Sequence, residues 1–258
     1  MKLAASNIGW RAEYDQTAWQ LLHTYGYTGL EAAPTRLVPA PPYGRAADAA
    51  ALARKLQADY GLCIPSLQSI WYGRSGNLFD PADAPALIDY TGQAAAFAAA
   101  VGCKSLVFGC PRGRVMPAGG RPADAIPFFS AIVEKAARYG VRIALEANPP
   151  VYGTNFVNTS AEAFAFARQV PGLWVNYDLG TVLTGGESLR TLAENLPLVS
   201  HIHISEPEMA PIARRPLHRE LAVLLADGGY EGFVSIEMKT QPDEVLEPVL
   251  DYIAEVFR

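Results

Sequence analysis

Four short apolar stretches in the second half of the chain each end in a side chain that can bind a metal ion. One of them, VSHIHISE at residues 199–206, alternates apolar and polar residues as a β-strand does, and it holds two of the four histidines. The other three each carry one carboxylate near the C-terminal end, namely Glu146 in IALEAN, Asp178 in LWVNYDLG and Glu237 in FVSIEMK. A strand that ends in a metal ligand, used four times, restricts the folds that this chain can adopt.

Strand-like and helix-like segments alternate along the whole chain. Strands are expected at residues 2–8, 28–33, 64–70, 105–108, 143–148, 173–180, 199–206 and 233–239. Helices are expected at residues 15–25, 46–60, 84–101, 123–139, 160–169, 187–195, 217–227 and 242–257. Residues 34–44 contain four prolines and are expected to form a loop. This order gives eight strand–helix units.

Repeated strand–helix units produce a parallel sheet, because each crossover helix returns the chain to the same end of the sheet. Eight such units in about 250 residues are typical of a (β/α)8 TIM barrel, so we expect an α/β fold with one domain over residues 1–258. An open doubly wound sheet is the alternative. It would be favoured by a GxGxxG loop after the first strand, and Asn7 to Trp10 (NIGW) lack that pattern. The chain also lacks the phosphate-loop and serine-hydrolase motifs GxxxxGK[ST] and GxSxG.

Composition argues against several classes of partner. A formal net charge of -5 disfavours nucleic acid, whose phosphates favour a basic surface. The three cysteines show no CxxC spacing, which argues against a disulfide framework and suits a reducing cytoplasm. No apolar run is long enough to span a membrane. We therefore expect a cytoplasmic protein with a small-molecule substrate, and the sequence is compatible with a homo-oligomer.

The four metal-binding side chains are expected to converge. Active sites of α/β barrels lie at the C-terminal ends of the strands, where Glu146, Asp178, His203 and Glu237 fall on four successive strands. Side chains two residues apart share a face of a strand, so His201 and Asn176 are expected one layer deeper in the barrel, where they would contact and orient the ligand side chains. Three carboxylates and one imidazole favour one divalent ion, with Mn²⁺ first and Mg²⁺, Co²⁺ or Zn²⁺ as alternatives.

Such a site predicts proton-transfer chemistry on a sugar. Four ligands leave about two positions free on a six-coordinate ion, which two neighbouring sugar oxygens can fill. The ion would polarise a carbonyl group and stabilise a metal-bound enediolate. Glu146 and Glu237 would then be the catalytic acid and base that move the α-proton.

Further polar residues lie near the expected mouth of the barrel. Five of them are candidates for binding the substrate: Glu31, Gln68, Asn148, Glu206 and Lys239. Two basic loops at the same end could hold a phosphate or carboxylate group, or could form a solvated rim; they contain Arg112, Arg114 and Arg121, and Arg214, Arg215 and Arg219.

The ordered motifs LEANP, NYDLGT, HIHISE and SIEMK resemble those of the sugar phosphate isomerase/epimerase family of xylose isomerase-like barrels. That grouping includes ketose 3-epimerases, inosose dehydratases and, more distantly, endonuclease IV. The resemblance covers essentially the whole chain and implies the same four ligands and the same acid/base pair. The chain differs from ketose epimerases at Thr181, where they carry histidine, at Met209, where they carry arginine, and near Tyr152, where they carry a second glutamate.

These observations lead to one main functional hypothesis. We expect an isomerase or epimerase that acts on a sugar, a sugar phosphate or a related polyol. A metal-dependent lyase, similar to inosose or dehydroshikimate dehydratases, is the alternative. An endonuclease IV-like phosphodiesterase and a non-catalytic sugar-binding barrel are less favoured, the first because few histidines remain outside the HxH pair.

Overall fold

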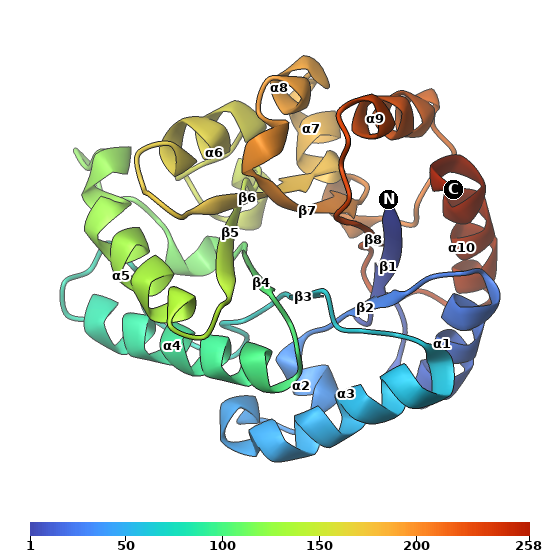
Figure 1. Cartoon of the computed structure of the whole chain (residues 1–258). Helices are drawn as coiled ribbons and strands as arrows, with labels where there is room; N and C mark the ends of the chain where they lie inside the picture. Colours follow the sequence, from blue (N-terminus) through green and yellow to red (C-terminus); the bar gives the residue numbers. More distant parts are fainter.

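The chain folds into a ring of eight parallel strands, as the sequence predicts. The computed structural model describes residues 1–258, and Figure 1 shows the ring along its axis. The strands are β1 (Lys2–Ser6), β2 (Gly29–Glu31), β3 (Ser66–Leu67), β4 (Ser105–Phe108), β5 (Arg142–Glu146), β6 (Trp174–Asp178), β7 (Val199–Ile204) and β8 (Phe233–Ile236). They pair in the order β2-β1-β8-β7-β6-β5-β4-β3. Two isolated parallel bridges, Gly29 with Cys63 and Ala32 with Leu67, connect the two ends of this order, so the (β/α)8 barrel is confirmed.

The helices form an outer layer around the ring (Figure 1). They are α1 (Asp15–Thr24), α2 (Pro34–Leu37), α3 (Ala46–Tyr60), α4 (Ala84–Ala100), α5 (Ile126–Ala137), α6 (Ser160–Ala167), α7 (Leu179–Gly185), α8 (Arg190–Ala193), α9 (Pro216–Asp227) and α10 (Asp243–Phe257). In α10 the buried residues Leu246, Leu250, Ile253 and Phe257 recur every three or four positions, which is the spacing of one helix face. None of the helices combines the length and apolar composition needed to cross a bilayer.

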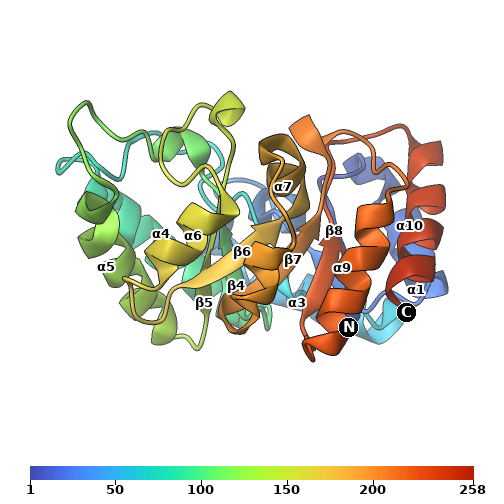
Figure 2. The same cartoon turned by 90° about the horizontal axis from the view of Figure 1, so that it is seen from above.

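The inside of the barrel is unusually polar. Register pairs Glu146 of β5 with Asn176 of β6, and Asn176 with His201 of β7. One step further along, Asp178 pairs with His203, and His203 pairs with Ser235 of β8. Because side chains alternate along a strand, these residues share the inward face while their apolar neighbours pack under the helices. In Figure 2 the loops that follow the strands gather at the top and both termini lie at the bottom.

Several expected helix and strand boundaries were wrong. The first is the loop expected over residues 34–44, and the prolines in this segment explain the difference. The proline-rich residues 34–44 contain α2 and a 3₁₀ helix (Pro42–Arg45), each with proline in its first turn. Proline favours this position because its fixed φ suits a helix and its missing N–H is not needed there. The helix expected from residue 123 starts as a 3₁₀ turn (Pro122–Ala125), and α5 follows.

The strand expected over residues 173–180 also ends early. The side chain of Asp178 accepts a hydrogen bond from the backbone N–H of Thr181 at 2.6 Å, which caps α7 immediately after β6. The strand expected over residues 64–70 forms ladder pairs only at Ser66–Leu67, and the helix expected over residues 187–195 is reduced to α8.

Candidate metal centre

The four predicted ligands meet at the C-terminal end of the barrel. Nδ1 of His203 lies 3.0 Å from Oε1 of Glu146 and 3.1 Å from Oε2 of Glu237. Oδ2 of Asp178 is 4.0 Å from the same nitrogen. One donor atom from each of the four side chains lies within 4.8 Å of every other donor atom. The segments that supply them are therefore brought to one point, as their positions on successive strands predict.

This spacing fits a six-coordinate cation. With metal–oxygen bonds of about 2.1 Å, neighbouring ligand atoms of an octahedron stand about 3.0 Å apart and opposite ones about 4.2 Å. The contacts of 3.0, 3.1 and 4.0 Å around Nδ1 of His203 have these values. Three carboxylates also bring three formal negative charges to a largely buried site, where a single imidazolium cannot balance them. The donor set and its spacing thus suit a divalent ion.

Glu31 fixes the orientation of His203 from below. Its Oε2 lies 3.0 Å from Nε2 of His203 and 2.8 Å from Nε2 of His201, and it accepts a hydrogen bond from Oγ of Ser66 at 2.5 Å. Because Nε2 of His203 is engaged by Glu31, Nδ1 is the nitrogen that faces the three carboxylates. A carboxylate behind a histidine ligand selects its tautomer and strengthens it as a ligand.

Amide and guanidinium groups hold Glu146 in place. Asn176 donates to Oε1 of Glu146 at 2.7 Å, and Asn148 donates to Oε2 at 3.0 Å. Fully buried Arg114 donates to the backbone oxygen of Glu146 at 2.8 Å and to Oδ1 of Asn148 at 2.6 Å. Behind them, a Cβ atom at Gly109 would come within 2.8 Å of Oε2 of Glu146, so the close approach of the β4 loop needs glycine.

Asn176 and His201 differ from each other in depth. Both were expected one layer below the ligands, but Asn176 touches Glu146 directly, whereas His201 contacts Glu31 and Ser66. The reason is the stagger of tilted strands in a barrel, which places Asn176 level with Glu146 in the β5–β6 register.

Electrostatics within the cluster push the pKa values apart. Burial raises the pKa of Glu237 to about 7, with the charges of Glu146 and Asp178 adding to the effect. Burial also raises the pKa of Asp178. Burial acts in the same direction on Glu146, but the hydrogen bond and charge of His203 outweigh it, and the pKa of Glu146 is lowered. Burial opposes protonation of His203, yet the charges of Glu237 and Glu31 raise its pKa well above the ordinary value.

A cavity of about 890 Å³ opens directly above the cluster. Glu146, Asp178 and Glu237 line its floor, and Gln68, Asn148 and Glu206 also line it. These last three were predicted to contact a substrate, and the structure places them where contact is available. Tyr152 also lines the cavity, and burial together with the charges of Asp178, Glu237 and Glu146 raises its pKa to about 12.

Two other residues predicted to bind substrate lie elsewhere. Glu31 is completely buried beneath His203 and does not line the cavity, because β2 ends at Glu31 and its side chain points into the barrel. Lys239 is exposed and also absent from the lining; its backbone N–H donates to the oxygen of Met209 at 2.9 Å. β8 ends at Ile236, so the two-residue alternation that suggested a shared face with Glu237 does not extend to Lys239.

The two basic loops divide into paired and unpaired arginines. Arg215 forms a bidentate contact with Glu206, with Nη2 and Oε2 2.5 Å apart, while Arg214 and Arg219 contact exposed Glu255. In the other loop Arg121 pairs with Asp124. Arg112 lines the cavity. The burial of Arg114 was missed because nothing in the sequence distinguishes it from its neighbours.

Backbone strain also gathers at this end of the barrel. All five non-glycine residues with positive φ lie in loops that follow strands: Ser69, Cys110, Val157, Glu208 and Met209. Three of them, Ser69, Cys110 and Met209, line the cavity. Left-handed backbone at such residues costs roughly 1–3 kcal/mol each and clusters at functional sites.

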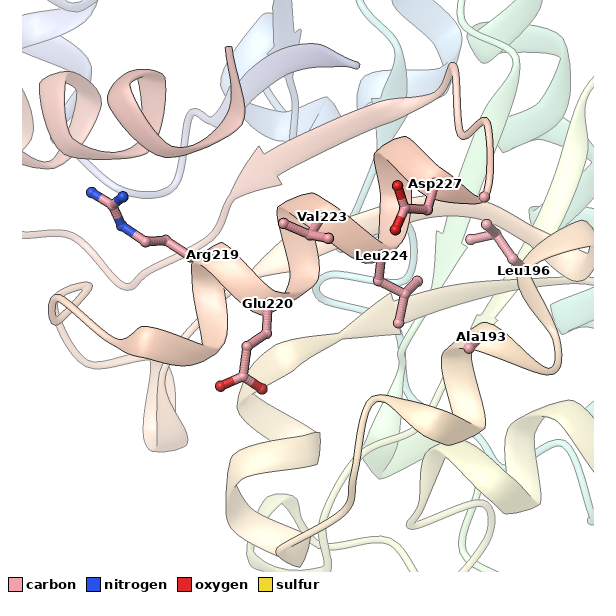
Figure 3. Close-up of a pocket in the computed structure, with 8 residues that line it drawn as sticks. Ala193, Leu196, Arg219, Glu220, Val223, Leu224 and Asp227 are labelled. Carbon is pink, nitrogen blue, oxygen red and sulfur yellow. The ribbon is translucent and has the colours of Figure 1, made fainter.

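A second hollow, of about 770 Å³, lies on the outer layer between α8 and α9 (Figure 3). Its lining mixes apolar side chains such as Leu196 and Leu224 with the charged side chains of Arg219, Glu220 and Asp227. No group of metal-binding side chains is assembled there. The cavity above the cluster of Glu146, Asp178, His203 and Glu237 is therefore the candidate functional site.

Comparisons with known proteins agree with this geometry. A family model described as a xylose isomerase-like TIM barrel matches residues 19–256. Among curated protein sequences none matches the chain. A 3-keto-D-glucoside 4-epimerase from E. coli is similar in structure, with a TM-score of 0.78 and 18% identity over 99% of this chain and 98% of that one.

Two further solved structures have the same fold. A D-psicose 3-epimerase from Clostridium cellulolyticum H10, solved with D-tagatose, has a TM-score of 0.79 and 17% identity over 100% of both chains. A probable 3-DHS dehydratase from Bacillus anthracis has a TM-score of 0.70 and 16% identity over 97% of both chains. At these identities the likeness establishes the fold that the enzymes share with this chain.

Proposed function

The chain belongs to the family of xylose isomerase-like TIM barrels, and on this premise we propose that it is a divalent-metal-dependent isomerase or epimerase of a sugar, sugar phosphate or related polyol. The observation that carries the proposal is the convergence of donor atoms from Glu146, Asp178, His203 and Glu237 within 4.8 Å of one another. The cluster lies on the floor of the large cavity, where a small polar molecule can reach it.

The proposed ligands of the ion are the same four side chains, with Mn²⁺ as the preferred metal because the donors are mostly hard oxygens. When bound, such an ion polarises a carbonyl oxygen and stabilises negative charge that develops beside it. Glu31 keeps Nδ1 of His203 directed at the cluster. The three cysteines are unpaired, which supports a cytoplasmic location.

Glu146 and Glu237 are the proposed acid/base pair. Both line the cavity, Glu146 at the end of β5 and Glu237 directly after β8, two strands that are not neighbours in the sheet. The pKa of Glu146 is lowered, which keeps its carboxylate ready to accept a proton, and the pKa of Glu237 is raised to about 7. Carboxyl groups whose environments drive their pKa values apart are typical of acid/base pairs. One removes the proton next to the carbonyl group and the other returns a proton to the opposite face.

A lyase is the second candidate, and Tyr152 favours it. Tyr152 lines the same cavity as the carboxylates; burial, and then the charges of Asp178, Glu237 and Glu146, raise the pKa of its hydroxyl to about 12, so it holds its proton at neutral pH. A protonated group at this position can donate to a departing hydroxyl after the α-proton has been removed. One of the structurally similar proteins is a probable dehydratase.

The decisive experiment incubates the purified protein, loaded with Mn²⁺, with free sugars, sugar phosphates and inososes. A product of unchanged mass identifies an isomerase or epimerase, and a product lighter by one water identifies a lyase. Metal analysis is run in parallel, and about one divalent ion per chain is expected. Full turnover by protein that has been stripped of metal would refute the proposed function.

A further inference from the structure

One wall of the cavity, beside the acidic cluster, carries positive charge. Two segments form it, residues 69–75 after β3 and residues 109–114 after β4. Together they contain three arginines, Arg74, Arg112 and Arg114, and no aspartate or glutamate. Arg74 and Arg112 line the cavity with Ser69 and Ser75, whereas Arg114 is buried next to it.

The two segments are fixed to each other. A Cβ atom at Gly113 would lie 2.8 Å from the ring of Trp71, so the loops pack in direct contact there. The backbone N–H of Leu78 donates to the oxygen of Gly113 at 2.8 Å. Trp71 is anchored in turn by a 2.9 Å hydrogen bond from its Nε1 to Oγ1 of Thr91. Arg74 and Arg112, close in sequence to Trp71 and Gly113, are exposed side chains that line the cavity from these two packed segments.

Neither cavity arginine has an acidic partner. No carboxylate forms a salt bridge with Arg74 or Arg112, in contrast to Arg121 and Arg215 nearby. The guanidinium of Arg74 stacks on the ring of Tyr90 at 4.5 Å, which restrains the group but leaves the N–H donors at its edge free. Arg114 is buried next to the cavity, where its Nη2 donates to the backbone oxygen of Glu146 and to Oδ1 of Asn148, while its Nε and Nη1 have no hydrogen-bond partner.

We propose that this wall is an anion subsite, and that the substrate carries a phosphate or carboxylate group that Arg74 and Arg112 bind. The inference deepens the proposed function and rests on it for the placement of the reacting carbons at the metal-binding cluster. A substrate with an anionic group at one end and neighbouring oxygens at the other is complementary to a cavity that is basic on one wall and acidic on its floor. Arginine is suited to both anions, because its donor pairs match two oxygens at once.

The test measures binding directly and needs no turnover. Inorganic phosphate and, separately, acetate are titrated into the full-length protein after removal of metal, so that an ion in the acidic cluster cannot bind them. Phosphate or acetate should bind to the wild type, and the double variant Arg74→Gln/Arg112→Gln should bind it weaker by about tenfold or more, because each arginine supplies charge-assisted hydrogen bonds. The tighter-binding anion of the two identifies the group carried by the substrate.

The matched control also removes two arginine charges, at positions outside the cavity. Arg121→Gln/Arg138→Gln alters two arginines that are largely exposed, pair with Asp124 and Glu134, and do not line the cavity. This control should keep wild-type affinity for the anion. Equal weakening in both double variants, or no binding of either anion by the wild type, would overturn the subsite. Loss of metal in Glu237→Ala with anion binding intact separates this result from the test of the proposed function.

Discussion

His203 and Glu31 lie 172 residues apart in the chain and meet inside the barrel, with Nε2 of the imidazole 3.0 Å from Oε2 of the carboxylate. The contact reaches across the barrel from β2 to β7, which are not neighbours in the sheet. It leaves Nδ1 of His203 as the atom that faces Glu146, Asp178 and Glu237. The candidate centre therefore depends on a fourth acidic residue, Glu31, that supplies no donor atom to it.

The first prediction concerns this contact. Glu31→Gln keeps the size of the side chain but removes the negative charge that orients and polarises His203. Affinity for Mn²⁺ should fall about 10- to 100-fold, the usual loss when a partner behind a ligand is changed. Competition with a metal-binding dye measures this affinity. Glu187→Gln is the control, because Glu187 accepts hydrogen bonds from the backbone of Ser160 on the outer layer. Unchanged affinity in Glu31→Gln would contradict the role assigned to Glu31.

The second prediction concerns protons in the cluster. Without a cation, the raised pKa values of His203 and Glu237, the latter about 7, keep protons on these side chains near neutral pH. A divalent ion must displace them, so its binding should release protons and tighten as pH rises from 6 to 8. Calorimetry in buffers of different ionisation enthalpy counts the released protons. A metal affinity that is constant over this range would contradict the prediction.

The same shifts determine how the metal-free protein responds to pH. The raised pKa of His203 contributes stability below the ordinary histidine pKa of about 6.5, and this contribution is lost as pH rises through the folded-state value. The raised pKa of Glu237 acts in the same direction, because folding disfavours its ionised form. With a chelator present, the thermal midpoint should therefore fall between pH 6 and 8, and saturating Mn²⁺ should raise it most at pH 8.

The sequence was sufficient to predict the barrel and the convergence of four side chains that could hold a metal ion, and the reason is local. Strand–helix alternation can be recognised from short stretches of sequence. The polar side chain at the C-terminal end of each strand can likewise be recognised from its immediate neighbours. Glu146, Asp178, His203 and Glu237 each follow from their own strand, and parallel neighbours then bring them together.

Other features could not be predicted because they depend on contacts between distant segments. The position of Glu31 beneath His203 requires the tilt and stagger of strands that are not adjacent. The burial of Arg114 depends on how the β4 loop packs against Glu146 and Asn148. Helix α7 was missed because the side chain of Asp178 begins a helix where the apolar pattern continued.

The third prediction concerns the stability of the β7 loop. Glu206 is 3% exposed and is neutralised by Arg215, whose side chain is 37% exposed. Arg215→Gln leaves a buried carboxylate without its cation, and it should lower the free energy of unfolding by about 2 kcal/mol, below the 3–5 kcal/mol of a fully buried pair because water reaches Arg215. Urea denaturation measures this loss. Arg219→Gln, which breaks an exposed pair with Glu255, should change stability by less than about 0.5 kcal/mol. Equal losses in the two variants would contradict the prediction.

The last prediction tests Glu146 as an acid/base group. Glu146→Gln keeps the size of the side chain and one oxygen, which can accept one of the two hydrogen bonds that Asn148 and Asn176 donate to the carboxylate. It cannot accept the substrate proton, so turnover with excess Mn²⁺ should fall by about 10²- to 10⁴-fold. Metal content and the thermal midpoint of the variant separate lost chemistry from lost metal or lost fold.

Glu208→Gln provides the control for charge at the same end of the barrel. Glu208 is an exposed carboxylate in the β7 loop that does not line the cavity, and its loss should leave turnover at the wild-type level. If Glu146→Gln binds metal and keeps wild-type turnover, then Glu146 is only a ligand, and another titratable group that lines the cavity, such as Glu237, Asp178 or Tyr152, must move the proton.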